Sequence, residues 1–246
     1  MSEGRPPHAA LLRAPAGFDA RLVAGVLARR SALPAESWLP VVRRAWGIVA
    51  EPSAAEDAEA LAAALTAAGQ PALAAPVSLL EEPPPEVVVT KAELSGDGFD
   101  VVAGRGAEVE RLTWTHLKVV SAGAVVEGGL KPAAVPGGKG NTRPVSEDRR
   151  TPFIDLLFAA PARRLRIIAE GFDYAALGPK MSYSAELNFR TLAAELCARA
   201  PAALRGKGAR GVLSKAPSGA LEYESFDDVQ REERWLLALS ALEAAL

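Results

Sequence analysis

Residues 86–170 decide the fold of this chain, because strand-length runs rich in Val, Ile and Leu follow one another there. The runs are EVVVTKAEL (86–94), GFDVVAG (98–104), AEVERLTW (107–114), HLKVVSAGAVV (116–126), FIDLLFAA (153–160) and RRLRIIAE (163–170). β-Branched and aliphatic runs of this length, separated by turn residues, are typical of strands. Between the first two runs, Ser95-Gly-Asp-Gly98 supplies the glycines that a tight hairpin needs for positive φ. We predict one antiparallel β unit.

Alternation within the runs predicts which face of this unit is wet. In the last run Leu165 and Ile167 point one way, and Arg164 and Arg166 point the other. Such a pattern is typical of an antiparallel sheet with one buried and one solvated side. We therefore expect the two arginines to be solvated, and Trp114, at the end of an earlier run, to lie in the core.

The chain has 246 residues, of which 49% are hydrophobic, enough to bury the cores of two domains of ordinary size. Its 28 basic and 30 acidic residues give a formal net charge of −2, so no global field draws nucleic acid or an anionic membrane. Neither a signal-peptide core nor a run of about 18 apolar residues occurs. We expect a cytoplasmic protein without membrane insertion.

Residues 8–78 alternate between strand and helix signals and predict a small β-α-α-β-α-β module. Asp19 is placed to cap the first helix, and Pro34 suits the first turn of the second. Pro40 should break that second helix or restart it, because proline removes a backbone donor and clashes with the preceding turn.

The third helix of this module carries the strongest local signal in the chain. Ser53-Ala-Ala-Glu56 matches a capping box, and apolar residues recur after it at helical spacing. Gly69 stands where a left-handed C-cap belongs. The pattern predicts a helix from about Ala54 to Ala68.

Residues 52–70, PSAAEDAEALAAALTAAGQ, resemble the last helix and turn of the C-terminal domain of the bacterial ribosomal stalk protein, which also has the β-α-α-β-α-β order. The resemblance implies that fold for residues 8–78 and the general role of a protein-docking module. The lysine-rich helical surface and glycine turn of that family are absent here, so no binding residue is carried over. The corresponding helices carry instead Arg21, Arg29, Arg30, Arg43 and Arg44.

Residues 79–85 are a predicted proline-rich linker, because three consecutive prolines favour a stiff extended spacer. The second domain, residues 86–246, is predicted to hold the antiparallel β unit and C-terminal helices, one of them Ala185–Arg199 with Ser184 as its cap. This layout resembles bacterial pleckstrin-homology-like domains, and the resemblance implies a binding scaffold. The predicted fold class is therefore α+β.

Residues 128–150 are predicted to form a long mobile loop, because Gly, Pro and charged residues dominate them. Within this stretch Gly137-Gly-Lys-Gly-Asn-Thr142 has the composition of a phosphate loop but lacks its spacing, since Ser or Thr should follow the lysine directly. Residues 104–106, Gly-Arg-Gly, are interpreted as a hairpin turn. We expect no cofactor, no metal site and no catalytic residue.

Histidine and cysteine chemistry has little material in this chain. The only histidines are His8 and His116, and we expect the imidazole of His116 to be structural or solvent-facing. Cys197 is the single cysteine, which excludes an intrachain disulfide. Its place on the flank of a helical stripe predicts a buried, inert thiol.

Cationic and aromatic residues converge at the end of the last run and in the turn after it. The candidate partner-binding residues are Arg163, Arg164, Arg166, Tyr174 and Lys180. Arginine and tyrosine are enriched at protein interfaces. An alternative stays open, in which the aromatic residues close the end of the sheet and the arginines are merely solvated.

The sequence as a whole predicts a non-catalytic binding or adaptor protein whose partner is another protein. The rival hypothesis is an enzyme or small-ligand sensor with a pocket between the domains, lined by carboxylates such as Asp155, Glu170 and Asp173. Convergence of these carboxylates in a concave pocket would favour the rival, and dispersal would count against it. Nucleic-acid binding would need the arginines of both halves on one face, and we do not expect it.

Overall fold

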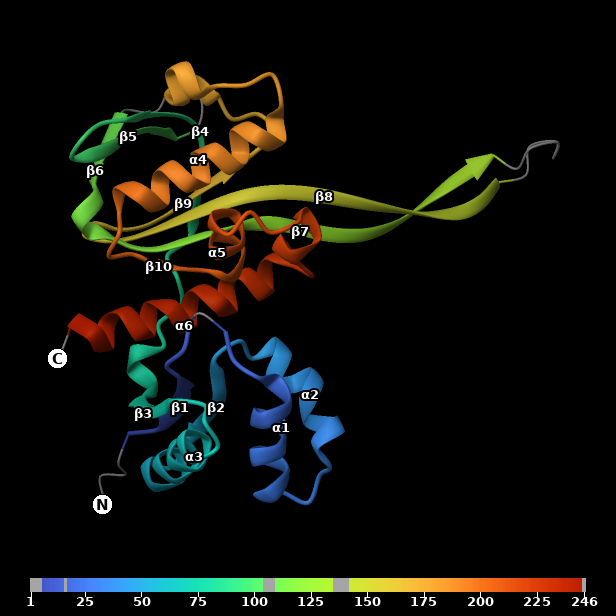
Figure 1. Cartoon of the computed structure of the whole chain (residues 1–246), viewed down its shortest axis with the longest axis vertical. Coiled ribbons are helices and arrows are strands. Elements are labelled where there is room, and N and C mark those ends of the chain that lie inside the picture. Colours follow the sequence, from blue (N-terminus) through green and yellow to red (C-terminus); the bar gives the residue numbers. More distant parts are fainter. Residues whose placement is uncertain (1–5, 16, 104–108, 135–141, 245–246) are drawn as a thin grey trace.

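The computed structural model describes residues 6–15, 17–103, 109–134 and 142–244, and it combines helices with two β-sheets (Figure 1). The N-terminal module follows the predicted order. Its elements are β1 (His8–Leu12), α1 (Ala20–Arg29), α2 (Ala35–Arg44), β2 (Ile48–Ser53), α3 (Ala55–Ala67) and β3 (Ala72–Pro76), followed by a 3-10 helix, η1 (Val77–Leu79). β1 pairs antiparallel with both neighbours, so the strand order is β2-β1-β3.

Two of the local signals in this module act as predicted. The Asp19 side chain accepts hydrogen bonds from the backbone N–H groups of Arg21 and Leu22, at 2.8 and 3.2 Å, and so caps α1. Gly69 follows α3 with φ of +81°, the left-handed conformation expected of a C-cap. These signals succeed because cap and helix are adjacent in the sequence.

Two other local predictions are wrong. α2 runs through Pro40 without a break. Pro40 and Glu36 are both exposed, so water can satisfy the carbonyl that proline leaves without a donor. Ser53 does not cap α3, because its hydroxyl donates to the His8 carbonyl across the β1–β2 pair at 3.0 Å, and the cap position falls on Ala54.

The second sheet has eight strands and combines two antiparallel meanders, β4-β5-β6 and β7-β8-β9. The strands are β4 (Glu86–Leu94), β5 (Gly98–Ala103), β6 (Val109–Thr113), β7 (Leu117–Ala134), β8 (Thr142–Ala159), β9 (Ala162–Ile168), β10 (Leu204–Arg205) and β11 (Glu222–Tyr223). The meanders join where β4 pairs with β9 in parallel, and β7 pairs in parallel with β10 and β11. The sheet is thus mixed, not antiparallel as predicted, because only strands joined by a hairpin must run antiparallel.

Helices cover both faces of this sheet. They are η2 (Trp114–His116), η3 (Tyr174–Lys180), α4 (Ala185–Arg199), α5 (Lys207–Leu213), η4 (Ser218–Leu221) and α6 (Phe226–Ala244). One face, with Leu165 and Ile167, packs on Phe189 of α4 and also buries Trp114, as predicted. The opposite face packs on α6, which lies between the large sheet and the N-terminal module (Figure 1). Residues 153–158 of β8 and 164–167 of β9 are therefore buried on both faces of the sheet.

The N-terminal module and the large sheet share one hydrophobic core through α6. Trp235 of α6 is buried among residues of β1, and its indole Nε1 donates to the Leu12 carbonyl at 2.8 Å. Gly47 lies flat against the same ring, where a Cβ atom would come within 1.8 Å of it. Contact this close requires glycine.

Residues 128–134 and 142–150 are strands, where the sequence had predicted a mobile loop. β7 and β8 pair continuously from Val126 opposite Arg150 to Ala134 opposite Thr142, forming a two-stranded ribbon that projects away from the body (Figure 1). We call residues 126–134 and 142–150 the β7–β8 ribbon. Residues 137–141 of the phosphate-loop-like stretch, and the predicted turn at residues 104–106, lie outside the described residues.

The prolines along β8 are compatible with this ladder. The Pro152 carbonyl accepts from the Ala169 N–H at 2.9 Å, so its backbone polar positions face away from β7. Pro144 has the same alternation along β8 and stands opposite Pro132. A proline at such a position removes no hydrogen bond from the pair.

Candidate functional site

The predicted binding residues do not form one surface. Arg163 and Lys180 are exposed, but both are paired on the surface: Arg163 Nε lies 3.2 Å from Glu110 Oε1, and Lys180 pairs with Glu195. Exposed pairs of this kind contribute little to binding or stability.

Tyr174 helps to close the end of the sheet. It is half-buried, and its ring lies edge-on to that of Phe172, with the centroids 5.2 Å apart. Burial raises the pKa of Tyr174 to about 12. The alternative in which the aromatic residues close the sheet therefore describes Tyr174 and Phe172 correctly.

Arg164 and Arg166 are not solvated, as the alternation had suggested, but buried under α6, with exposed fractions of 4% and 3%. Asp155 of β8 binds both: its Oδ2 lies 3.0 Å from Arg164 Nη2 and 2.6 Å from Arg166 Nη2, and its Oδ1 lies 2.8 Å from Arg166 Nε. The prediction failed because alternation identifies the two faces of a strand, but not what a helix from elsewhere in the chain places on them.

Glu233 of α6, which is buried, and Glu86 of β4, which is exposed, complete what we call the α6 charge cluster. Glu86 pairs with Arg166. Glu233 Oε2 lies 2.8 Å from Arg164 Nη2, yet neither Glu233 oxygen makes a hydrogen bond of good geometry. Burial, and then the charge of Asp155, raise the pKa of Glu233 well above the ordinary carboxyl value. A neutral Glu233 leaves the two guanidinium charges balanced by Asp155 and Glu86.

A second buried network lies beside the first and was missed by sequence reasoning. The Glu232 carboxylate accepts from the Tyr223 hydroxyl and from the Lys207 backbone N–H, both at 2.6 Å. Burial raises the pKa values of Glu232 and Tyr223 and lowers that of the Lys207 amine. The only sign of this network in the sequence is the pair of adjacent glutamates in α6. Charged residues in a helix are ordinarily solvated, so the pair gave no reason to expect a buried network. Both networks tie α6 to the sheet.

The three carboxylates of the enzyme hypothesis are dispersed. Asp155 is held in the α6 charge cluster, Asp173 is exposed and caps η3 by accepting from Ala175 N–H, and Glu170 is exposed beyond β9. His116 is exposed, and Cys197 is buried with a pKa raised by that burial. This dispersal counts against the enzyme hypothesis.

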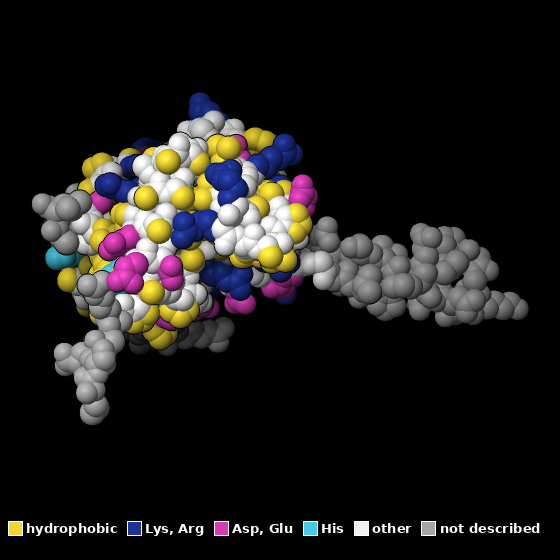
Figure 2. All heavy atoms as spheres, turned by 90° about the horizontal axis from the view of Figure 1, so that it is seen from below, with side chains coloured by type: hydrophobic (Ala, Val, Ile, Leu, Met, Phe, Trp, Pro, Cys, Tyr) yellow, Lys and Arg dark blue, Asp and Glu magenta, His cyan; other side chains and the backbone are white. Residues whose placement is uncertain are grey.

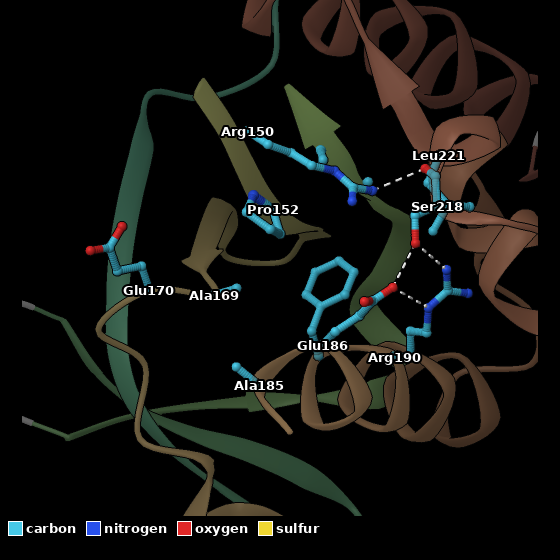
Figure 3. A pocket seen from close by; sticks show the side chains of 12 residues that line it. Arg150, Pro152, Ala169, Glu170, Ala185, Glu186, Arg190, Ser218 and Leu221 are labelled. Carbon is cyan, nitrogen blue, oxygen red and sulfur yellow. Dashed lines mark hydrogen bonds and ion pairs between the residues drawn. The ribbon is translucent and has the colours of Figure 1, made fainter. Parts of the chain in front are cut away.

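A cavity of about 310 Å³ lies at the foot of the β7–β8 ribbon (Figure 3). Its walls come from β7, β8, the segment after β9, the first turns of α4, and η4. The largely apolar lining includes Ala124, Pro152, Ala169, Phe189 and Leu221. We call it the foot cavity. It lies on the α4 face of the sheet, at the margin of the hydrophobic core, and is open to solvent.

Polar groups stand around the rim of the foot cavity. On one side Glu186 Oε1 accepts from the Ser218 hydroxyl at 2.6 Å and lies 3.3 Å from Arg190 Nε (Figure 3). These hydrogen bonds, that from Ser218 first, lower the pKa of Glu186. On the opposite side Glu170 makes no ion pair with any described residue, and its carboxylate points away from the other lining side chains (Figure 3).

The cavity also adjoins a free strand edge. β9 ends at Ile168, and no described strand pairs with β8 on that side before Phe153. By the alternation that turns the Pro152 carbonyl toward Ala169, the N–H and C=O of Arg150 face outward at this edge. Arg150 is exposed, and its side chain donates to the Ser218 carbonyl at 3.0 Å.

The outer face of the N-terminal module bears no single basic patch. Figure 2 shows Lys and Arg side chains on this face in separate groups, interleaved with hydrophobic side chains and with a group of acidic ones. A surface of mixed sign does not favour a polyanion.

Comparisons with known proteins give no relative: no protein-family model, no curated protein and no solved structure matches the chain. Within the described ranges, no group of three or more His, Cys, Asp or Glu side chains is placed to hold a metal ion. No helix in the same part of the chain has the length and apolar character needed to cross a membrane.

Proposed function

We propose that this chain is a non-catalytic binding protein that takes an extended segment of a partner protein at the foot of the β7–β8 ribbon. The observation that carries the proposal is the position of the apolar foot cavity directly beside the free edge of β8. An edge strand offers unpaired N–H and C=O groups to another chain. A pocket beside it adds selection of a side chain, which is the usual division of labour in strand addition.

The geometry supports a specific mode of docking. A partner strand laid along β8, where β9 has ended, would meet the outward N–H and C=O of Arg150. Every second side chain of that strand would point to the α4 face and toward the foot cavity. Its apolar walls favour an aliphatic or aromatic side chain there, and the unpaired carboxylate of Glu170 favours a basic residue nearby.

The two resemblances noted in the sequence agree with this role and remain part of the proposal. The β-α-α-β-α-β order of the N-terminal module supports likeness to the ribosomal stalk domain. A sheet with the long helix α4 across one face supports likeness to pleckstrin-homology-like domains. Both kinds of domain are scaffolds for binding, and we place the protein in the cytoplasm.

Two substitutions at Arg150 test the strand-addition step. Arg150→Pro removes the outward N–H without touching the β7–β8 ladder, whereas Arg150→Ala keeps the N–H. Both lose the hydrogen bond to Ser218, so they differ only at the edge. We expect immobilised wild type and Arg150→Ala to retain the same protein from a lysate of the native cells, and Arg150→Pro to lose it.

Filling the cavity tests the side-chain step. Ala169→Phe should abolish retention of that protein, while Ala60→Phe, which adds the same ring to the exposed face of α3, should not. Retention of one set of proteins by all these variants would refute the proposal. Light scattering measures whether copies of the protein associate with one another. If Arg150→Pro self-associates as wild type does, the contact between copies does not use the β8 edge at Arg150.

A further inference from the structure

A second cavity, of about 380 Å³, opens between the N-terminal module and the body. Phe18, Arg43, Arg44 and Trp46 of the module face Lys207 and Tyr223 across it. We call it the Trp46 cavity. Ligand sites occur preferentially where two packed units meet, because each contributes side chains that the other cannot supply.

Aromatic rings form the inner wall of this cavity. The rings of Trp46 and Tyr223 are 5.4 Å apart between centroids and tilted by 34°. The Lys207 Nζ atom lies 5.6 Å from the centroid of the Trp46 ring and 4.9 Å from that of the Tyr223 ring. The ammonium group therefore lies over both rings, at cation–π distance from each. Flat apolar surface next to a fixed cation suits a planar ring that carries a negative charge.

The module side of the cavity carries two arginines that have no ion pair among the described residues. Arg43 and Arg44, in the last turn of α2, are exposed and make no ion pair with any described residue. Of the acidic groups, Asp228 is paired with Arg231 at 3.3 Å. Glu222 lies 3.7 Å from Arg150, and Glu224 is the remaining acid. Arg43 and Arg44 are therefore the unpaired cations of the cavity, whereas Lys207 Nζ donates to the Glu222 carbonyl at 2.7 Å and is also acted on by the charges of Glu232 and Asp228.

Trp46 itself is held in an unusual state. Its φ of +53° lies in the left-handed region, which bulky residues rarely adopt, and the adjoining Gly47 is fixed against Trp235. Its indole Nε1 is buried and finds no hydrogen-bond partner within the described residues. Strained backbone clusters at active sites and ligand clamps, and a buried donor without a partner calls for an explanation, of which a ligand is one.

We propose that the Trp46 cavity binds a small anionic ligand with a planar ring. The ring stacks on Trp46, and the anionic group meets Arg43, Arg44 and Lys207. Phosphate and carboxylate are the two anions that arginine forks recognise, so a nucleotide and an aromatic carboxylate share the required chemistry. The site is separate from the foot cavity and does not depend on the proposed protein partner.

Calorimetric titration of the full chain with two probes tests the site. Adenosine 5′-monophosphate carries the ring and a phosphate, and indole-3-acetate carries a ring and a carboxylate. We expect one of them to bind with a Kd below about 1 mM, at least roughly tenfold tighter than adenosine or inorganic phosphate alone. The tighter of the two identifies the anion. Equal binding by inorganic phosphate would mean a simple anion site, and no saturable binding of either probe would overturn the proposal.

A pair of double variants locates the binding. Arg43→Ala with Arg44→Ala should weaken the bound probe at least roughly tenfold. Arg29→Ala with Arg30→Ala removes the same charge from the far end of α1, outside the cavity, and should leave the affinity unchanged. All four arginines are exposed, so both variants should keep the wild-type melting temperature. Equal loss in the two variants would reduce the effect to general charge and refute the site.

Discussion

Asp155 Oδ2 lies 2.6 Å from Arg166 Nη2, and the same carboxylate binds Arg164, so one buried acid on β8 holds two guanidinium groups of β9. The side chains that looked most available for a partner are thus committed inside the molecule. Arg166 also stacks on Phe226 of α6, with its guanidinium carbon 4.0 Å from the ring centroid. The contact between Arg166 and Phe226 therefore stabilises the position of α6 on the sheet.

Removing Asp155 should be costly. Asp155→Ala would leave Arg164 and Arg166 buried with too little opposing charge, and loss of one partner from a buried pair costs about 3–5 kcal/mol. Glu110→Ala, which breaks the exposed pair with Arg163, should change the free energy of unfolding by less than about 1 kcal/mol. Urea unfolding followed by fluorescence measures both. Similar values for the two variants would mean that the buried cluster is not structural.

Glu233 should make stability depend on pH. Because burial raises its folded pKa, the stabilisation by the protonated form is complete below the ordinary value of 4.5 and is lost as pH rises through the folded pKa. Glu233→Gln keeps the size and neutrality, so it should flatten the fall in unfolding free energy above pH 4.5. Glu232, shifted in the same direction, should preserve part of the slope.

The matched control for this experiment is Glu170→Gln, at the exposed rim of the foot cavity. It should leave the pH profile as in wild type. If the pH profile of Glu233→Gln coincides with those of wild type and Glu170→Gln, Glu233 is ionised in the folded protein.

Gly47→Ala should loosen the N-terminal module from α6. A Cβ at this position would fall 1.8 Å from the Trp235 ring, so the ring or the backbone must move, and such overpacking costs about 1–3 kcal/mol. Gly96 does not have the positive φ that the sequence had suggested for this hairpin, and it has open space around it. Gly96→Ala should therefore be within about 0.5 kcal/mol of wild type. Thermal unfolding compares them. A neutral Gly47→Ala would imply that the contact with Trp235 is easily rearranged.

Shortening the β7–β8 ribbon should leave the body intact. Beyond Val126 and Arg150 the two strands pair only with each other in the described structure. Joining these residues by Asn-Gly, a favoured hairpin turn, should shift the melting temperature by less than about 4 °C, the equivalent of about 1 kcal/mol at this size. A much larger drop would show that the ribbon folds back onto the body.

The sequence predicted the N-terminal elements because their signals are local. Asp19 caps the helix that begins at the next residue, and Gly69 follows the end of α3. The apolar stripe lies within α3 itself. Ser184 likewise caps α4 by accepting from Leu187 N–H, as predicted. Signals of this kind do not require knowledge of the tertiary structure.

The candidate site could not be predicted in the same way, because its parts meet only in the folded chain. The foot cavity joins Ala124, Ala169, Phe189 and Leu221 from four separate segments. The burial of Arg164 depends on Glu233, far along the chain in α6. The ribbon was missed for a different reason. A proline interrupts a strand pair only where its nitrogen would have to donate a hydrogen bond, and the alternation along β8 puts Pro144 at a position that donates nothing to β7.

During synthesis, β1 and Gly47 leave the ribosome long before Trp235, the residue that covers them. At ordinary elongation rates the delay is on the order of 10–40 s. For that time the module has its strands and helices but lacks the α6 side chains of its core, so apolar surface stays open to water and to other nascent chains. Chains interrupted before α6 should be the form most dependent on chaperones, and the last long helix the element that releases them.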